Sequence, residues 1–137
     1  MDPWQTFLSA ESFAVAGASR DQQKYGNRIL KALIKSGRRV YPLNPNASEI
    51  EGLQAYASLA DLPEVPQSLL IVTPGPITRK VVEQAIALGV KNVWMQPGAQ
   101  EVQASLQARQ AGLNLIDDGS CILVSLAIER PTSKSEN

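Results

Sequence analysis

The sequence contains no histidine and only one cysteine, Cys121, among its 137 residues. Without histidine the chain cannot build a Ser-His-Asp or Cys-His catalytic arrangement, a histidine-ligated metal site or a histidine-based pH switch. A single cysteine cannot close an internal disulfide, so we expect a reducing compartment and not a disulfide-stabilised extracellular scaffold.

Long apolar segments are also missing. No stretch approaches the roughly 18 apolar residues that a membrane-spanning helix needs. The first ten residues, MDPWQTFLSA, lack the basic start and long apolar core of a signal peptide. We therefore expect a cytoplasmic protein with no membrane partner.

The net charge is zero, because 13 basic residues balance 13 acidic ones. This balance argues against nucleic-acid binding by bulk charge. The charge is unevenly distributed, however. Residues 20–39 carry a local charge of +6, so the remainder of the chain carries −6.

The length and the 44% hydrophobic content predict one globular domain. We place this domain at residues 1–129. Residues 130–137 are polar and unpatterned, so we expect them to form a frayed tail.

Short apolar runs alternate with amphipathic segments along the domain. A short helix is expected at residues 3–8, because Asp2 and Pro3 form a typical helix start. Strands are predicted at residues 12–16, 39–43, 68–73, 92–95 and 113–116. Helices are predicted at residues 27–36, 58–61 and 75–88, and one further helix is expected to end at Gly112. In the helix at 75–88 we expect these side chains to face inward: Ile77, Val81, Val82, Ala85, Ile86 and Leu88.

This alternation predicts an α/β fold, a doubly wound, Rossmann-like parallel sheet of five strands with helices on both faces. Ligands of such sheets bind beyond the carboxyl ends of the strands, near the point where the strand order reverses. The segments that follow the first four strands are therefore the candidate site.

The loop after the first strand, residues 17–24, has the chemistry of an anion site. Gly17 permits a tight turn that brings backbone amides near a phosphate. In the dinucleotide motif G-x-G-x-x-G, however, Ser19 replaces the second glycine and the third is absent. Arg20 and Lys24 precede a helix N-terminus, where positive charge is unfavourable unless an anion is bound.

The end of the second strand bears on which nucleotide would bind. NAD-binding proteins place an acidic residue there to accept the ribose 2′-hydroxyl. Here the segment from Tyr41 to Pro45 contains no acid, and the next one is Glu49. A ligand with an additional ribose phosphate fits better, and both NADP and coenzyme A (CoA) have one.

Four segments together resemble the small bacterial CoA-binding domain proteins, whose Rossmann-like fold is shared with the nucleotide-binding domain of the succinyl-CoA synthetase α subunit. They are FAVAGASR (13–20), KYGNR (24–28), YPLNP (41–45) and VWMQPGA (93–99). The resemblance extends from about Phe7 to Val124. Two positions depart from the family pattern. Gly75-Pro76 follows Thr73-Pro74, where the family more usually has a Thr-Pro-Pro-Glu type of turn. Ser120 precedes Cys121, where relatives often have arginine.

The resemblance implies a CoA site at the strand ends. Its residues would be Gly17, Ala18, Ser19, Arg20, Lys24, Tyr25, Gly26, Asn44, Pro45, Thr73, Pro74, Gln96, Pro97 and Gly98. We expect the first loop and the following helix N-terminus to hold the pyrophosphate, with Lys24 or Arg20 neutralising its charge. Asn44 and Thr73 would bond the nucleotide half.

Other conspicuous residues have simpler interpretations. Lys35 would lie roughly 16 Å along a helix from Lys24, so one ligand phosphate could not contact both. We therefore expect Lys24 or Arg28 to contact the ligand. Lys31 and Lys35 are expected to be solvated. Trp94 is expected in the core, although adenine stacking is the alternative. Cys121 is expected to pack as a small apolar group. Asp117 and its neighbour Asp118 lack the clustered oxygen partners of a metal site, and no metal is expected.

These observations predict non-catalytic binding of CoA or an acyl-CoA. The alternatives are an NADP-dependent oxidoreductase and a CoA-sensing regulatory or adaptor protein. Three absences argue against the oxidoreductase: the loop has no second glycine, the chain has no histidine, and there is no Tyr-x-x-x-Lys pair. The residue four positions after Tyr25 is Ile29 and not a lysine. A protein partner is open, and nothing in the sequence specifies it.

Overall fold

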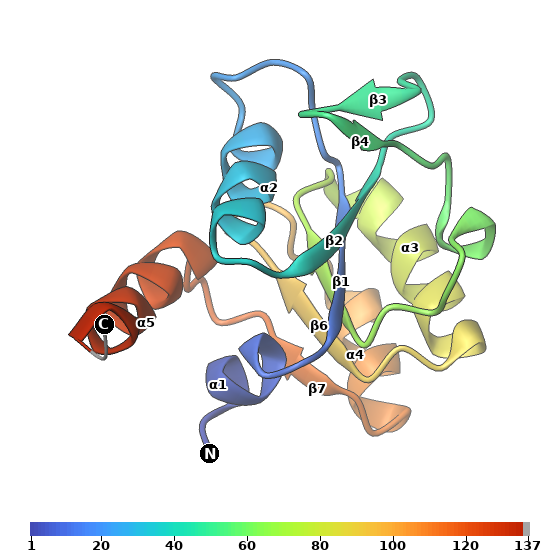
Figure 1. Ribbon diagram of the computed structural model, residues 1–137. Coiled ribbons are helices and arrows are strands. Elements are labelled where there is room, and N and C mark those ends of the chain that lie inside the picture. The colour runs from blue at the N-terminus through green and yellow to red at the C-terminus, as the bar shows by residue number, and fades with distance from the viewer. Residues whose placement is uncertain (136–137) are drawn as a thin grey trace.

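A computed structural model of the protein describes the backbone of residues 1–135 and the side chains of residues 1–129. Five parallel strands form the central sheet in the order β2-β1-β5-β6-β7 (Figure 1). They are β1 (Ser12–Ala16), β2 (Arg39–Leu43), β5 (Ser68–Ile71), β6 (Asn92–Met95) and β7 (Asn114–Ile116). The predicted doubly wound, Rossmann-like sheet is confirmed.

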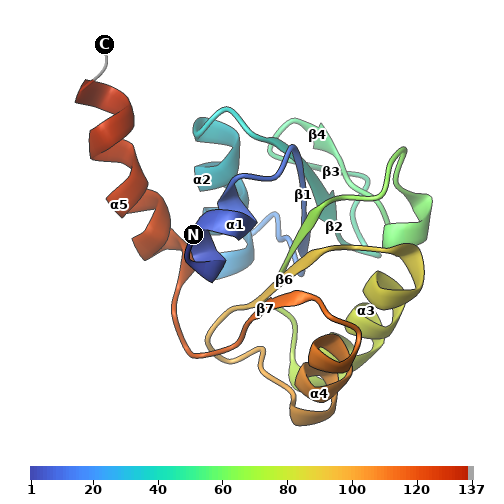
Figure 2. The same cartoon turned by 90° about the horizontal axis from the view of Figure 1, so that it is seen from below.

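Helices cover both faces of this sheet (Figure 2). One face carries α1 (Pro3–Leu8), α2 (Tyr25–Lys35) and α5 (Ile122–Ser135), and the other carries the one-turn helix η1 (Leu59–Asp61), α3 (Gly75–Leu88) and α4 (Val102–Gln110). Because both faces are covered, every residue of β1, β5 and β6 is buried, which explains why these strands are apolar after their first residue. Trp94 is fully buried and packs edge-on against Phe7, so its predicted core position is confirmed.

The inward face of α3 differs from the prediction. Val82 and Ala85 are fully buried as expected, whereas Ile77 and Leu88 are exposed. Thr78, which was not expected inside, is fully buried. The spacing of Thr78, Val82 and Ala85 is one stripe of a straight helix, and this stripe is too narrow to include Ile77 or Leu88.

Two parts of the fold were not predicted from the sequence. A small antiparallel hairpin, β3 (Glu49–Ile50) and β4 (Leu53–Gln54), follows β2. Helix α5 begins at Ile122 and buries Ile122 and Leu126, which lie one turn apart. Its backbone stays helical through Ser135, within the segment expected to fray. The prediction for that tail stays a prediction, because its side chains and residues 136–137 lie outside the described part.

The strand order defines where the sheet opens. The chain passes from β1 to β2 on one side and later returns to β5 on the other side of β1. The order reverses between β1 and β5, so the crevice for a ligand lies beyond the carboxyl ends of these two strands. No helix among the described residues is long and apolar enough to cross a membrane.

Candidate functional site

The sheet brings all the predicted site residues to one edge, because they follow the carboxyl ends of the parallel strands β1, β2, β5 and β6. The first loop and the start of α2 lie at the top of Figure 1, next to the β3–β4 hairpin. This placement at the strand ends agrees with the prediction.

Two glycines shape the first loop. Gly17 has φ +93°, in the region that favours glycine, and a Cβ there would lie 3.0 Å from Val72. Gly26, in the first turn of α2, lies against the loop so closely that a Cβ would stand 2.1 Å from the carbonyl oxygen of Gly17. Gly26 therefore permits the close helix–strand packing that the third glycine permits in G-x-G-x-x-G, although it lies nine residues after Gly17.

Three basic side chains lie beside this loop. Arg20, Lys24 and Arg28 are exposed and form no ion pair within residues 1–129. The guanidinium of Arg28 lies 5.5 Å from the centre of the Tyr25 ring, within the range of a cation–π contact. These unpaired cations flank the N-terminus of α2, whose dipole also favours an anion. The arrangement can hold a phosphate group.

Asn27 and Glu51 are neighbours of this loop that the sequence did not single out. The fully buried Asn27 donates from Nδ2 to the Ser19 carbonyl at 2.9 Å and to Glu51 Oε2 at 2.8 Å. Glu51 comes from the tip of the β3–β4 hairpin. No sequence signal identifies the pair, because 24 residues separate its members and each of these strands has only two residues.

The side chain of Asn44, at the end of β2, forms hydrogen bonds to other parts of the chain. Its Nδ2 donates to the carbonyl of Ala18 at 2.9 Å, and its Oδ1 accepts the Asn46 amide at 2.7 Å. Asn44 thus holds the end of β2 against the first loop. Its direct contact with a nucleotide stays a prediction.

Thr73 at the end of β5 is likewise paired. Thr78 donates to the Thr73 carbonyl at 3.1 Å, and the two hydroxyl oxygens lie 2.9 Å apart. Because the single Thr78 proton goes to the carbonyl, Thr73 donates in the second bond and keeps only acceptor capacity. Pro74 then precedes the first residue of α3 and remains exposed.

Gln96 at the end of β6 turns into the protein. It is 3% exposed, its Oε1 accepts the Ile122 amide at 2.9 Å, and its Nε2 lies 3.1 Å from Cys121 Sγ. Gln96 therefore anchors the start of α5. The adjacent Pro97 and Gly98 are exposed at the sheet edge, where they can border a ligand.

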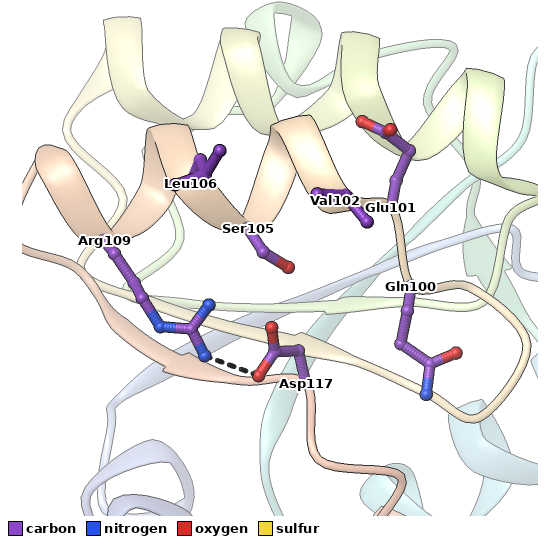
Figure 3. A pocket seen from close by; sticks show the side chains of 7 residues that line it. All are labelled: Gln100, Glu101, Val102, Ser105, Leu106, Arg109 and Asp117. Atoms are coloured by element: carbon purple, nitrogen blue, oxygen red, sulfur yellow. Dashed lines mark hydrogen bonds and ion pairs between the residues drawn. The ribbon is translucent and has the colours of Figure 1, made fainter.

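Two cavities lie away from the first loop. The one in Figure 3 has a volume of about 290 Å³ and lies between α4 and the end of β7. Asp117 pairs there with Arg109 at 2.7 Å. Burial raises the pKa of Asp117, but hydrogen bonds from Arg109 and Ser105 outweigh it and leave the pKa lowered. Hydrogen bonds from Arg79 and from the start of α4 lower the pKa of Glu101 to about 2. The second cavity, about 320 Å³, lies beside β2 and the hairpin.

Comparison with protein families gives a match over nearly the whole domain. Residues 11–127 match the family described as the CoA binding domain. The chain belongs to this CoA-binding domain family. Membership confirms the resemblance that the loop and strand-end segments indicated.

Proteins similar to this member of the CoA-binding domain family include two ADP-forming acetate–CoA ligases. One from Archaeoglobus fulgidus is 31% identical over 113 residues, which cover 75% of this chain and 16% of the ligase. One from Methanocaldococcus jannaschii is 36% identical over 81 residues, which cover 59% of this chain and 12% of the ligase. The chain thus spans less than a fifth of these relatives.

A small solved structure is similar over almost its full length. This conserved hypothetical protein from Pyrococcus furiosus has a TM-score of 0.78 and 38% identity, with 84% of this chain and 98% of that chain covered. The likeness supports the single-domain Rossmann-like architecture. The bacterial origin that the resemblance implied stays a prediction, since these three relatives are from archaea.

Proposed function

We propose that the protein binds CoA or an acyl-CoA at the carboxyl edge of its sheet and supplies no catalytic group of its own. The observation that carries the proposal is the first loop. There Gly17 and Gly26 keep the backbone close to α2, and three cations without an ion-pair partner among the described side chains flank the helix N-terminus. Membership of the CoA-binding domain family supports CoA as the occupant.

The residues present fit a pyrophosphate-containing ligand. The first-loop and α2 amides would hold the pyrophosphate, and Lys24 or Arg20 would neutralise its charge. Asn44 would contribute by fixing the loop, since both of its polar side-chain atoms have partners. CoA itself supplies the reactive thiol, so the protein needs only to bind and orient it.

A protein partner is part of the proposal. The two ADP-forming ligases from Archaeoglobus fulgidus and Methanocaldococcus jannaschii are each more than five times longer than the segment that matches this chain. Any reaction of bound CoA would use catalytic groups from outside these 137 residues, or CoA occupancy would be sensed by a partner. A pull-down with and without CoA separates a sensor from a passive carrier.

Calorimetric titration with CoA, acetyl-CoA, NADP and NAD tests the proposed function. We expect CoA or acetyl-CoA to bind more tightly than either dinucleotide. Absence of heat with both CoA forms would overturn the proposal, and tighter binding of NADP would favour the oxidoreductase alternative.

A charge variant with a matched control tests the location of the site. We expect Lys24→Ala to weaken CoA binding about tenfold, because it removes one charge-assisted contact. Lys31→Ala removes the same charge from the same helix two turns further on and should change the dissociation constant less than twofold. Equal effects of the two substitutions would argue against binding at the first loop.

A further inference from the structure

The tip of the β3–β4 hairpin has an unusual residue. Glu51 and Gly52 form a two-residue turn with φ +51° and +80°. Turns with two positive φ values favour asparagine and glycine, and a glutamate there is strained. The glutamate is exposed, and its carboxylate reaches across to Asn27 in the first turn of α2.

Asn27 does not have a partner for each polar atom of its side-chain amide in this contact. Its side chain is directed at the first loop, since Nδ2 donates to the Ser19 carbonyl as well as to Glu51. Its Oδ1 is buried and has no hydrogen-bond partner in the described part of the chain. Rotating the amide would place Oδ1 against the Ser19 carbonyl and the Glu51 carboxylate, so no amide orientation satisfies every group.

The charges around this contact point to a ligand anion. The N-terminus of α2 and its flanking cations Arg20, Lys24 and Arg28 favour negative charge, and these cations have no ion-pair partner within residues 1–129. Glu51 brings a carboxylate to the first turn of this helix from a distant part of the chain. The carboxylate is thus the protein's own anion beside a site suited to phosphate.

We infer that Glu51 is an affinity-setting residue, whose carboxylate occupies part of the phosphate position on α2 and is displaced when the ligand binds. This inference rests on the proposed function. Displacement releases the strained hairpin tip from α2 and frees the Asn27 Nδ2 to donate to a phosphate oxygen. The exposure of Glu51 allows the movement, because the side chain leaves the contact without passing through the core.

Removing the charge of Glu51 should therefore strengthen the binding of any pyrophosphate ligand. The variants are Glu51→Gln and Glu51→Asn, the second of which suits the left-handed turn and keeps the hairpin folded. Glu49→Gln is the control, because it removes one exposed carboxylate from the same hairpin without a bond to Asn27. The probes are CoA, ADP and inorganic pyrophosphate, titrated calorimetrically at low salt.

We expect both Glu51 variants to bind all three probes about five- to tenfold more tightly than the wild type, and Glu49→Gln to change binding less than twofold. In the wild type, amide hydrogen exchange at residues 49–54 should rise when the ligand is added. Equal effects at positions 49 and 51, or weaker binding by the Glu51 variants, would overturn the inference, the latter because Glu51 would then be contacting the ligand.

The same titrations separate this inference from the proposed function. If Glu51→Gln strengthens the binding of ADP and pyrophosphate while CoA does not bind any variant, the CoA function fails and the role of Glu51 is supported. If CoA binds and the Glu51 variants behave like Glu49→Gln, only the role of Glu51 fails. If none of the three probes binds any variant, both are overturned.

Discussion

At the scale of single residues, the two glycines of the first loop have different origins. Gly17 ends a buried strand, and its position alone predicts a tight turn. Gly26 is required because α2 and the loop come into contact in three dimensions, so that a Cβ on residue 26 would lie only 2.1 Å from the Gly17 carbonyl oxygen. Spacing along the sequence does not reveal this contact, since Gly26 lies outside the G-x-G-x-x-G register.

We expect Gly26→Ala to destabilise the protein by about 1–3 kcal/mol, because backbone must move to admit the methyl group. Urea denaturation measures this change, and titration should show weaker CoA binding as α2 shifts away from the loop. Gly75→Ala is the control, since Gly75 also begins a helix but its nearest Cβ contact would be an ordinary 3.6 Å. Similar losses of stability in the two variants would contradict the importance of the Gly26 contact.

At the scale of elements, the attachment of α5 depends on a polar side chain as well as on apolar packing. Gln96 follows β6 and accepts the amide of Ile122, the first residue of α5. Burial of that amide requires a partner, because the first turn of a helix has no internal acceptor for its N–H groups. The Gln-Pro-Gly turn thus joins the edge of the proposed site to the last helix.

We expect Gln96→Ala to lower the free energy of unfolding by about 1–3 kcal/mol, because the Ile122 amide is left buried without an acceptor. Equilibrium denaturation measures the loss. The matched variant Gln100→Ala removes a glutamine that is exposed in the same turn and bonded to the Gly98 amide, so its effect should stay within about 0.5 kcal/mol. If Gln96→Ala were as mild as the control, the Gln96 bond to Ile122 would not contribute to holding α5 in place.

At the scale of the whole molecule, ion pairs join elements that are distant in the sequence. Arg79 on α3 contacts Glu101 at the start of α4 at 3.0 Å, and Arg109 on α4 contacts Asp117 after β7. Hydrogen bonds from arginine hold the pKa of Glu101 near 2, and the pKa of Glu64 beside Arg39 is also lowered. These carboxylates stabilise the folded state only while they are ionised.

The response to acid follows from the pKa of Glu101. Because its folded-state pKa of about 2 lies below the ordinary value of 4.5, its contribution is complete above pH 4.5 and disappears as the pH falls toward 2. We expect Glu101→Gln to be less stable than the wild type at pH 7, with a difference that shrinks toward zero at pH 2. Urea denaturation at several pH values measures this.

Glu11→Gln serves as the control for that series. It removes one exposed carboxylate that forms no ion pair within residues 1–129. Its stability relative to the wild type should change little with pH over the same range. A pH-independent stability difference for Glu101→Gln would show that its ion pair does not contribute to acid sensitivity.

Local sequence patterns were enough to predict the sheet, most of its helices and the edge that carries the candidate site. Residues 13–16 of β1 are all apolar, and α2 has one apolar stripe, so periodicity along the chain reveals both elements. The family resemblance depended on contiguous segments in the same way, and the match to the CoA-binding domain family confirmed it.

Which side chains at that edge are free depends instead on the three-dimensional fold. Asn44 and Gln96 follow strands as predicted, but both bond to other segments of the chain. Glu51 lies next to Asn27 because a short hairpin folds back over the first loop. Such contacts join residues more than twenty positions apart, and local periodicity carries no information about them. The physical reason is that a buried polar group takes its partner from whatever the fold brings near it.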